Sequence, residues 1–193
     1  MKKSSIILIG VLAVLAIWCI SSYNSLVQKD EKVTKAWGNV ETQYQRRADL
    51  IPNLVEVVKG YAKHEQGTLT AVIEARSKAT SITIDPSNIT PEELAKYQEA
   101  QQGVAGALGK LLAVAEAYPD LKANENFGDL QKQLEGTENR IAESRREFNE
   151  AANEYNRDVR TFPNNILAGI FGLSTRAYFE SEYGANKAPK VEF

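Results

Sequence analysis

An uninterrupted apolar run near the N-terminus constrains this chain more than any other feature of its sequence. Fourteen of the fifteen residues from 6 to 20 are hydrophobic, and no charged residue occurs between Lys3 and Lys29. A helix from Ser4 to Tyr23 would be about 30 Å long, which matches the hydrocarbon thickness of a bilayer. We therefore expect residues 1–23 to form a single transmembrane helix.

Two other N-terminal signals fit the same run less well. A cleaved signal peptide needs small residues before its cleavage point, and the residues that end the run, Trp18-Cys19-Ile20-Ser21, do not supply them. A lipoprotein signal needs a small residue just before the cysteine, where Trp18 stands. Trp18 and Tyr23 lie instead where an aromatic belt would meet the membrane surface. We expect a retained anchor whose partner is the lipid bilayer.

Charges at the two ends of the anchor favour one orientation. Lys2 and Lys3 precede the apolar run directly, whereas Lys29, Lys32 and Lys35 follow several residues after it and alternate with acidic residues. Cations close to a transmembrane helix collect on the cytoplasmic side. This pattern predicts a cytoplasmic N-terminus and a domain on the other side of the membrane.

The chain after residue 23 has the composition of a soluble domain. Its 170 residues include 67 hydrophobic ones, about 39%, which is ordinary for a globular protein. They carry 21 basic and 25 acidic side chains, and this negative balance argues against nucleic acid as a partner, since phosphate binding needs clustered cations. Cys19 is the only cysteine, which excludes an intrachain disulfide and a Cys/His zinc site.

Apolar residues recur every three or four positions along most of this domain, which is the pattern of helices that face a bundle core. The first such stripe is Tyr23, Leu26, Asp30, Val33, Trp37, Val40 and Tyr44. Asp30 is its one charged member. Pro52 interrupts the hydrogen-bond ladder of a helix, so we expect a break or sharp kink between Ala48 and Pro52.

Three more helices are predicted after that break. The second runs from about Leu50 to Ala79 and ends in a loop rich in turn-forming residues. The third begins at Thr90-Pro91-Glu92-Glu93, where a capping threonine, a proline at the first helical position and a glutamate three residues later form a helix start. The fourth carries a stripe from Phe127 and ends near Thr161.

These elements predict an all-α fold, an antiparallel four-helix bundle over residues 24–162. If Pro52 only kinks the chain, the alternative is a three-helix coiled coil whose first helix extends from the membrane as a stalk. Residues 163–193 form a tail. Its segment Ile166–Leu173 is too short to span a bilayer, and we expect it to cover the open end of the bundle or, as the second choice, to lie on the membrane surface. Lys187–Phe193 is expected to be extended.

We find no catalytic, cofactor-binding or metal-binding residues in the sequence. His64 is the only histidine, and Thr68 occupies the second ligand position of a zinc-protease motif. The glycine-rich segment 103–110 lacks the spacing and the hydroxyl residue of a phosphate loop. We interpret Arg46 and Arg47 as structural, through ion pairs or carbonyl contacts at the expected corner. We expect the acidic residues near the stripes to lie at solvated edges: Glu41, Glu56 and Glu116.

Ten segments resemble, in order, the signature segments of the LemA family. They are residues 23–27, 36–40, 45–55, 59–65, 111–119, 126–127, 130–131, 137–142, 155–156 and 162–163. The resemblance extends over nearly the whole chain from the anchor to Phe193. It implies a bacterial, single-pass membrane protein with a helical-bundle domain. It implies no enzymatic activity, cofactor or ligand, and so no catalytic positions.

The anchor, the long helices and the missing site chemistry favour a scaffold or adaptor for envelope protein assembly. Its helical surface would bind another envelope protein or a second copy of the chain. The alternative is a sensory or small-ligand-binding module with a pocket between the helices. Three polar residues on the stripes are the candidates to line such a pocket: Gln101, Thr137 and Ser144. We do not expect an enzyme.

Overall fold

The longest helix, α1 (Lys3–Tyr61), joins the apolar segment to the folded domain without interruption. The computed structural model describes residues 3–180. After α1 come α2 (Gln66–Thr80), α3 (Pro91–Ala115), the single turn α4 (Pro119–Lys122), α5 (Glu125–Arg160) and α6 (Asn164–Phe171). Every regular element in the described part of the chain is helical, which confirms the all-α fold class.

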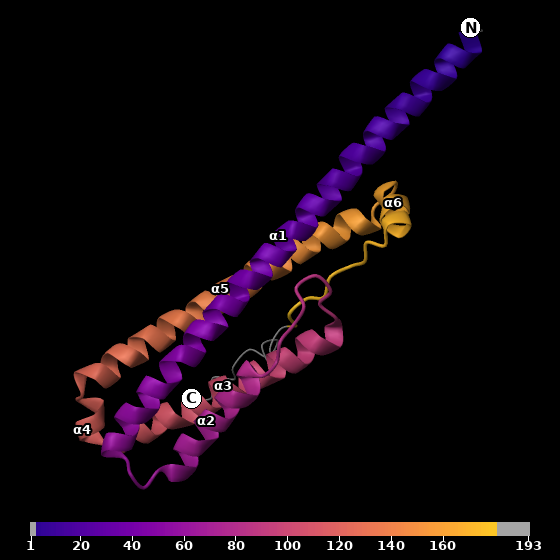
Figure 1. The fold of residues 1–193 in the computed structure, drawn as a ribbon. Coiled ribbons are helices and arrows are strands. Elements are labelled where there is room, and N and C mark those ends of the chain that lie inside the picture. The colour runs from indigo at the N-terminus through magenta and orange to yellow at the C-terminus, as the bar shows by residue number, and fades with distance from the viewer. Residues whose placement is uncertain (1–2, 181–193) are drawn as a thin grey trace, which may run out of the picture.

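Four of these helices form the expected antiparallel bundle. Figure 1 shows α1 and α5 side by side along most of the bundle, with α2 and α3 forming a second pair beside them. The chain descends in α1, returns in α2, descends again in α3 and returns in α5. Each helix therefore buries its apolar stripe against neighbours that run in the opposite direction.

The N-terminal part of α1 projects beyond the bundle (Figure 1). Within residues 3–180, α1 is the one helix long and apolar enough to cross a membrane, and no residue of its most apolar stretch is buried by the rest of the protein. Burial begins at Leu26 and continues at Val33 and Trp37. One element therefore contains both a candidate membrane span and a core helix of the bundle.

The helix break expected between Ala48 and Pro52 is wrong. The helix α1 runs through Pro52 to Tyr61, and the chain turns only at residues 62–65. The first part of the expected second helix therefore belongs to α1, and α2 is correspondingly short. The alternative, a three-helix coiled coil, correctly has one long first helix that passes Pro52. The chain nevertheless forms four bundle helices, because it turns at residues 62–65 and continues as α2.

The predicted start of the third helix is confirmed in atomic detail. The Thr90 hydroxyl oxygen accepts a hydrogen bond from the Glu93 backbone N–H at 3.2 Å, and the Glu93 carboxylate accepts one from the Thr90 N–H at 3.2 Å. The last bundle helix also ends where expected. Its final residue is Arg160, and Thr161 caps it.

Two clusters of buried side chains make up the core. The cluster nearer the projecting end of α1 is rich in aromatic residues and centres on Trp37, whose ring lies 5.3 Å from Tyr97 and 5.6 Å from Phe148. The cluster at the far end is mainly aliphatic and includes Leu54 and Leu111. The bundle therefore has an aromatic half near the apolar span and an aliphatic half away from it.

The tail returns along the bundle after α6. Gly172, with φ of 70°, ends α6 in the left-handed conformation that favours glycine. Two asparagines, two turns apart on α5, then hold the tail. The side chain of Asn149 binds the backbone N–H and the backbone carbonyl of Phe179, and the side chain of Asn156 binds the same two groups of Arg176. The Phe179 ring is buried against Trp37 and Phe148. Lys187–Phe193, expected to be extended, lies outside the described residues.

Candidate functional site

Arg47 is a buried charge at the junction of the two core clusters. Only 2% of the residue is exposed, and on α1 it lies between Tyr44 of the aromatic cluster and Ile51 of the aliphatic cluster. A buried guanidinium is costly unless its donors are satisfied. The stability of the middle of the bundle therefore depends on whether the contacts of Arg47 satisfy its hydrogen-bond donors.

The Arg47 guanidinium joins three helices. One terminal nitrogen, Nη1, donates to a carboxylate oxygen of Glu138 on α5 at 2.8 Å. The other, Nη2, donates to the Gln101 backbone carbonyl on α3 at 2.9 Å and to the Gln101 side-chain oxygen at 2.6 Å. Its planar group also lies over the Tyr44 ring, 5.1 Å from the centroid. Arg47 is thus structural, as interpreted from the sequence, although the corner expected there does not exist.

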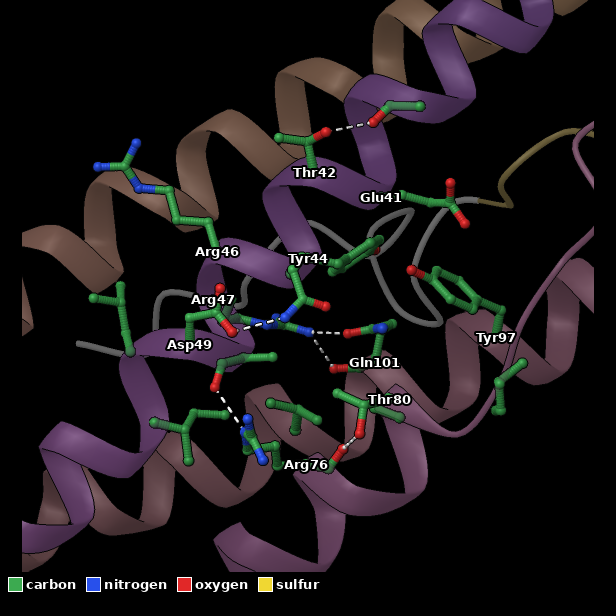
Figure 2. A pocket seen from close by; sticks show the side chains of 18 residues that line it. Glu41, Thr42, Tyr44, Arg46, Arg47, Asp49, Arg76, Thr80, Tyr97 and Gln101 are labelled. Carbon is green, nitrogen blue, oxygen red and sulfur yellow. Dashed lines mark hydrogen bonds between the residues drawn. The ribbon is translucent and has the colours of Figure 1, made fainter.

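A groove of about 690 Å³ opens beside this cluster, between α1, α2 and α3. Figure 2 shows Arg47 and Gln101 pointing toward each other across its base, while Arg46 points away from both. Its polar lining residues are Glu41, Thr42, Tyr44, Gln45, Arg46, Arg47, Asp49, Arg76, Thr80, Tyr97 and Gln101. The lining offers both charge signs and several hydroxyl groups, which suits a small polar ligand better than an apolar one.

Pro52 explains why α2 is hydrogen-bonded to α1 along one wall of the groove. A proline has no backbone N–H, so in a helix it leaves the carbonyl oxygen four residues earlier without its usual donor. In α1 that oxygen belongs to Ala48, and the Arg76 side chain on α2 donates to it through Nε at 2.7 Å. Pro52 therefore creates the acceptor that fixes α2 to α1 without ending the helix.

Two titratable groups of the groove are shifted by their surroundings. Burial raises the pKa of the Glu41 carboxyl above its usual range, and the nearby Trp37 indole lowers it by less. Burial, together with nearby Tyr44 and Glu41, raises the pKa of the Tyr97 hydroxyl far above its usual range. Glu41 lies at the half-buried rim rather than in open solvent.

The three polar residues expected to face a pocket are all buried, but they do not lie together. Gln101 lines the groove and binds Arg47. Thr137 donates a hydrogen bond to the Gln133 carbonyl of its own helix at 2.7 Å, and Ser144 lies further along α5; neither lines the groove. Of the three, only Gln101 belongs to the candidate site.

The remaining candidates lie at the surface. His64 is exposed in the turn at residues 62–65, and Glu56 and Glu116 are exposed on or next to helices. Within residues 3–180, no group of His, Cys, Asp and Glu side chains is arranged to hold a metal ion.

Sequence reasoning missed two arginines that fix the fold. Arg76 follows Leu69 and Val72 at helical spacing on the inner face of α2, and an arginine at such a position indicates a buried acceptor. Arg176, 9% exposed, binds both carboxylate oxygens of Asp30 at 2.8 Å. Asp30 was the one charged member of the first stripe, and a charge among core positions requires a partner. The sequence therefore did indicate that Asp30 needs a basic partner, although it did not identify Arg176.

Comparison with known proteins gives a consistent set of relatives. Residues 36–193 match the LemA family. Magnetosome proteins MamQ 2 and MamQ 1 of Paramagnetospirillum magneticum are each 28% identical to the chain over 197 aligned positions, which cover 92% of this chain and 72% of each relative. Protein LemA of Metamycoplasma hominis is 26% identical over 158 positions, with 82% of this chain and 68% of that protein covered.

The family match spans most of the chain and includes all of α2 to α6 and α1 from Ala36 onward, which is most of the part of α1 that lies in the core. The ten segments that resemble the family's signatures fall on the helices and turns just described, including the segment with Arg47 and Pro52. This protein belongs to the LemA family.

Proposed function

We propose that this protein is a membrane-anchored scaffold or adaptor that holds a helical surface at a fixed place in the bacterial cell envelope. The observation that carries the proposal is the continuity of α1 from its exposed apolar span into the bundle core. A flexible linker would let the bundle move freely, whereas a single helix transmits position and direction from the membrane to the bundle. The proposed role is to position partners and involves no catalysis.

The partner surface in this proposal is the outer face of the bundle. Exposed polar and charged residues cover most of it, and Ile73 on α2 is a large apolar side chain that remains 52% exposed there. In this proposal that surface binds another envelope protein or a second copy of the chain, with Ile73 as one apolar contact among polar ones.

Photo-crosslinking in intact cells tests the scaffold proposal. A crosslinking amino acid would replace one exposed residue on each outer helix, with Ile73, Ala105 and Arg140 as positions on α2, α3 and α5. We expect at least one position to give a discrete product that survives purification in mild detergent. A product from one face and not the others would define the interface. Only uncrosslinked monomer from all three positions would contradict the scaffold.

We also propose, from the charges around the span, that the bundle lies outside the cytoplasmic membrane. A Ser81→Cys substitution in a Cys19→Ser background places one thiol at an exposed site between α2 and α3. An impermeant thiol reagent should label it in intact cells. Protection in intact cells with labelling after lysis would place the bundle in the cytoplasm.

The groove between α1, α2 and α3 supports a second candidate, a sensory or ligand-binding module. Native mass spectrometry of the purified full-length protein would detect a retained small molecule. Thr42→Trp would fill the groove, whereas Asn39→Trp places the same bulk on an exposed position of α1 outside it. Ligand loss in the first variant alone would favour the module, and absence of any ligand in the wild type would favour the scaffold.

A further inference from the structure

We propose that α6 is a second membrane-contacting element, whose exposed apolar face lies at the boundary between lipid headgroups and acyl chains. The inference rests on the proposed insertion of the apolar span of α1, and it adds a point of contact that the span alone does not supply. The partner is therefore a lipid surface, and four arguments lead to it.

The helix α6 is apolar on two opposite faces. One face, with Leu167 and Ala168, is buried against the bundle. The other face carries Ile166 and Ile170, four residues apart and so on the same side of the helix, and they are 54% and 70% exposed. Phe162, just before the helix, is 75% exposed. Large side chains of this kind are rarely left in water together without a partner.

This face lies at the level where α1 leaves the bundle. The Phe171 ring at the end of α6 packs on the Tyr23 ring, with 4.6 Å between the centroids. Tyr23 is the last residue of the twenty-residue apolar segment expected to span the bilayer. Figure 1 shows α6 at the end of the bundle from which α1 projects. The exposed face of α6 is therefore continuous with the surface that the span presents to lipid.

The size and the charge of the patch favour lipid over protein. The patch consists of four exposed side chains, Phe162, Ile166, Ile170 and Phe171. A stable protein interface uses roughly 20 to 30 residues on each side. Arg157 and Arg160 are exposed in the last turn of α5, just before the patch. Cations next to an exposed apolar face are the arrangement by which surface helices bind anionic bilayers.

The contact would be weak for an isolated eight-residue helix, but α1 holds α6 at the membrane. A tether of this kind makes the second contact effectively intramolecular, so modest apolar burial is sufficient. Two contacts also limit how far the bundle can tilt relative to the membrane. The end of the bundle that carries α6 would then stay at the membrane, and the sides of the bundle would stay available to a partner.

Fluorescence quenching in proteoliposomes tests this assignment. Single cysteines would be introduced into the full-length Cys19→Ser protein as Ile170→Cys, Val14→Cys and Ile73→Cys, and each would carry the same environment-sensitive dye. All three side chains are more than half exposed, so the substitutions spare the core. The vesicles would contain phosphatidylcholine and phosphatidylglycerol, with and without spin-labelled lipid. Position 14 reports the span, and position 73 is the control on a distant helix.

We expect the dye at position 170 to be quenched by spin-labelled lipid nearly as strongly as the dye at position 14, and that at position 73 to be unaffected. Quenching at position 14 with position 170 behaving like position 73 would overturn the α6 contact and leave the anchor and the scaffold proposal intact. A blue-shifted dye at position 170 that responds to protein density but not to labelled lipid would also overturn it, because a second copy of the chain would then cover the patch. No quenching at position 14 would overturn the anchor itself and the inference with it.

Discussion

At the scale of single residues, Arg47 connects three helices through one guanidinium. Its removal leaves the Gln101 side chain and Glu138 without their donor and opens a space between the two core clusters. Losing one partner of a buried charged network is among the costlier single changes. We predict that Arg47→Ala lowers the free energy of unfolding by about 3 kcal/mol. Chemical unfolding of the full-length protein in mild detergent measures it.

The adjacent Arg46 is the matched control. It is exposed and points away from Arg47 and Gln101 (Figure 2). Arg46→Ala removes the same charge from the same helix, and we expect a change within about 0.5 kcal/mol. Equal losses from the two substitutions would show that net charge, and not the buried network, determines the effect.

Glu41 gives a pH dependence with a definite sign. Burial raises the pKa of its carboxyl in the folded protein, so as pH rises the unfolded chain releases this proton first. Glu41 then lowers stability progressively between the ordinary pKa of glutamate and its raised value in the fold. Glu41→Gln cannot ionise. We predict that the stability of Glu41→Gln relative to wild type increases as the pH rises above the ordinary pKa of glutamate.

Unfolding of both proteins across that pH range measures the difference, and Glu56→Gln, at an exposed position of the same helix, is the control. A stability difference between Glu41→Gln and wild type that stays constant with pH would contradict the assigned shift.

At the scale of elements, Pro52 and Arg76 form a pair that can be tested as a unit. Arg76→Ala leaves the Ala48 carbonyl without a donor, which we expect to cost about 1 to 3 kcal/mol. In a Pro52→Ala background the new N–H of residue 52 can donate to that carbonyl. We therefore predict that the same Arg76→Ala change costs much less there. A double-mutant cycle measured by unfolding gives the coupling.

Additive effects in this cycle would mean that Arg76 stabilises α2 through contacts other than the Ala48 carbonyl. Arg46→Ala combined with Pro52→Ala supplies the reference for an arginine that does not contact Ala48. We expect no coupling in that second cycle.

The same pair shows how far local patterns predict elements. The three- and four-residue spacing predicted that residues 23–44 and 127–155 are helical, because that pattern depends only on which face is buried. The expected break at Pro52 was also based on a local fact, the missing backbone N–H of proline. The local sequence does not show that Arg76, 28 positions after Ala48, supplies the missing donor to the Ala48 carbonyl. The real turn at residues 62–65 contains no proline or glycine, so local chemistry gave little sign of it.

The candidate site was less predictable than the fold. The sequence predicts a structural role for Arg47 and a pocket-facing position for Gln101. It does not predict the groove, because the groove depends on which helices become neighbours. The tail shows the same limit. Asp30 on the first stripe required a cation, yet several arginines could have supplied it, and only the packing of the chain selects Arg176.

At the scale of the whole molecule, the apolar span and the bundle share one helix. The helix α1 has 59 residues, which corresponds to about 90 Å at 1.5 Å per residue. Its N-terminal third is exposed apolar surface, and the rest is the central core element. In this account the position of the bundle relative to the membrane is set by a rigid element, and the proposed scaffold role depends on that rigidity.

The distance between two spin labels on α1 tests this claim most directly. Ser21→Cys and Asn53→Cys, both at exposed positions, would be labelled in the full-length Cys19→Ser protein reconstituted in lipid bilayers. Their separation of 32 residues predicts a single narrow distance distribution centred at about 48 Å. A broad distribution, or one centred well below that distance, would show a flexible joint between the span and the bundle and would contradict the account.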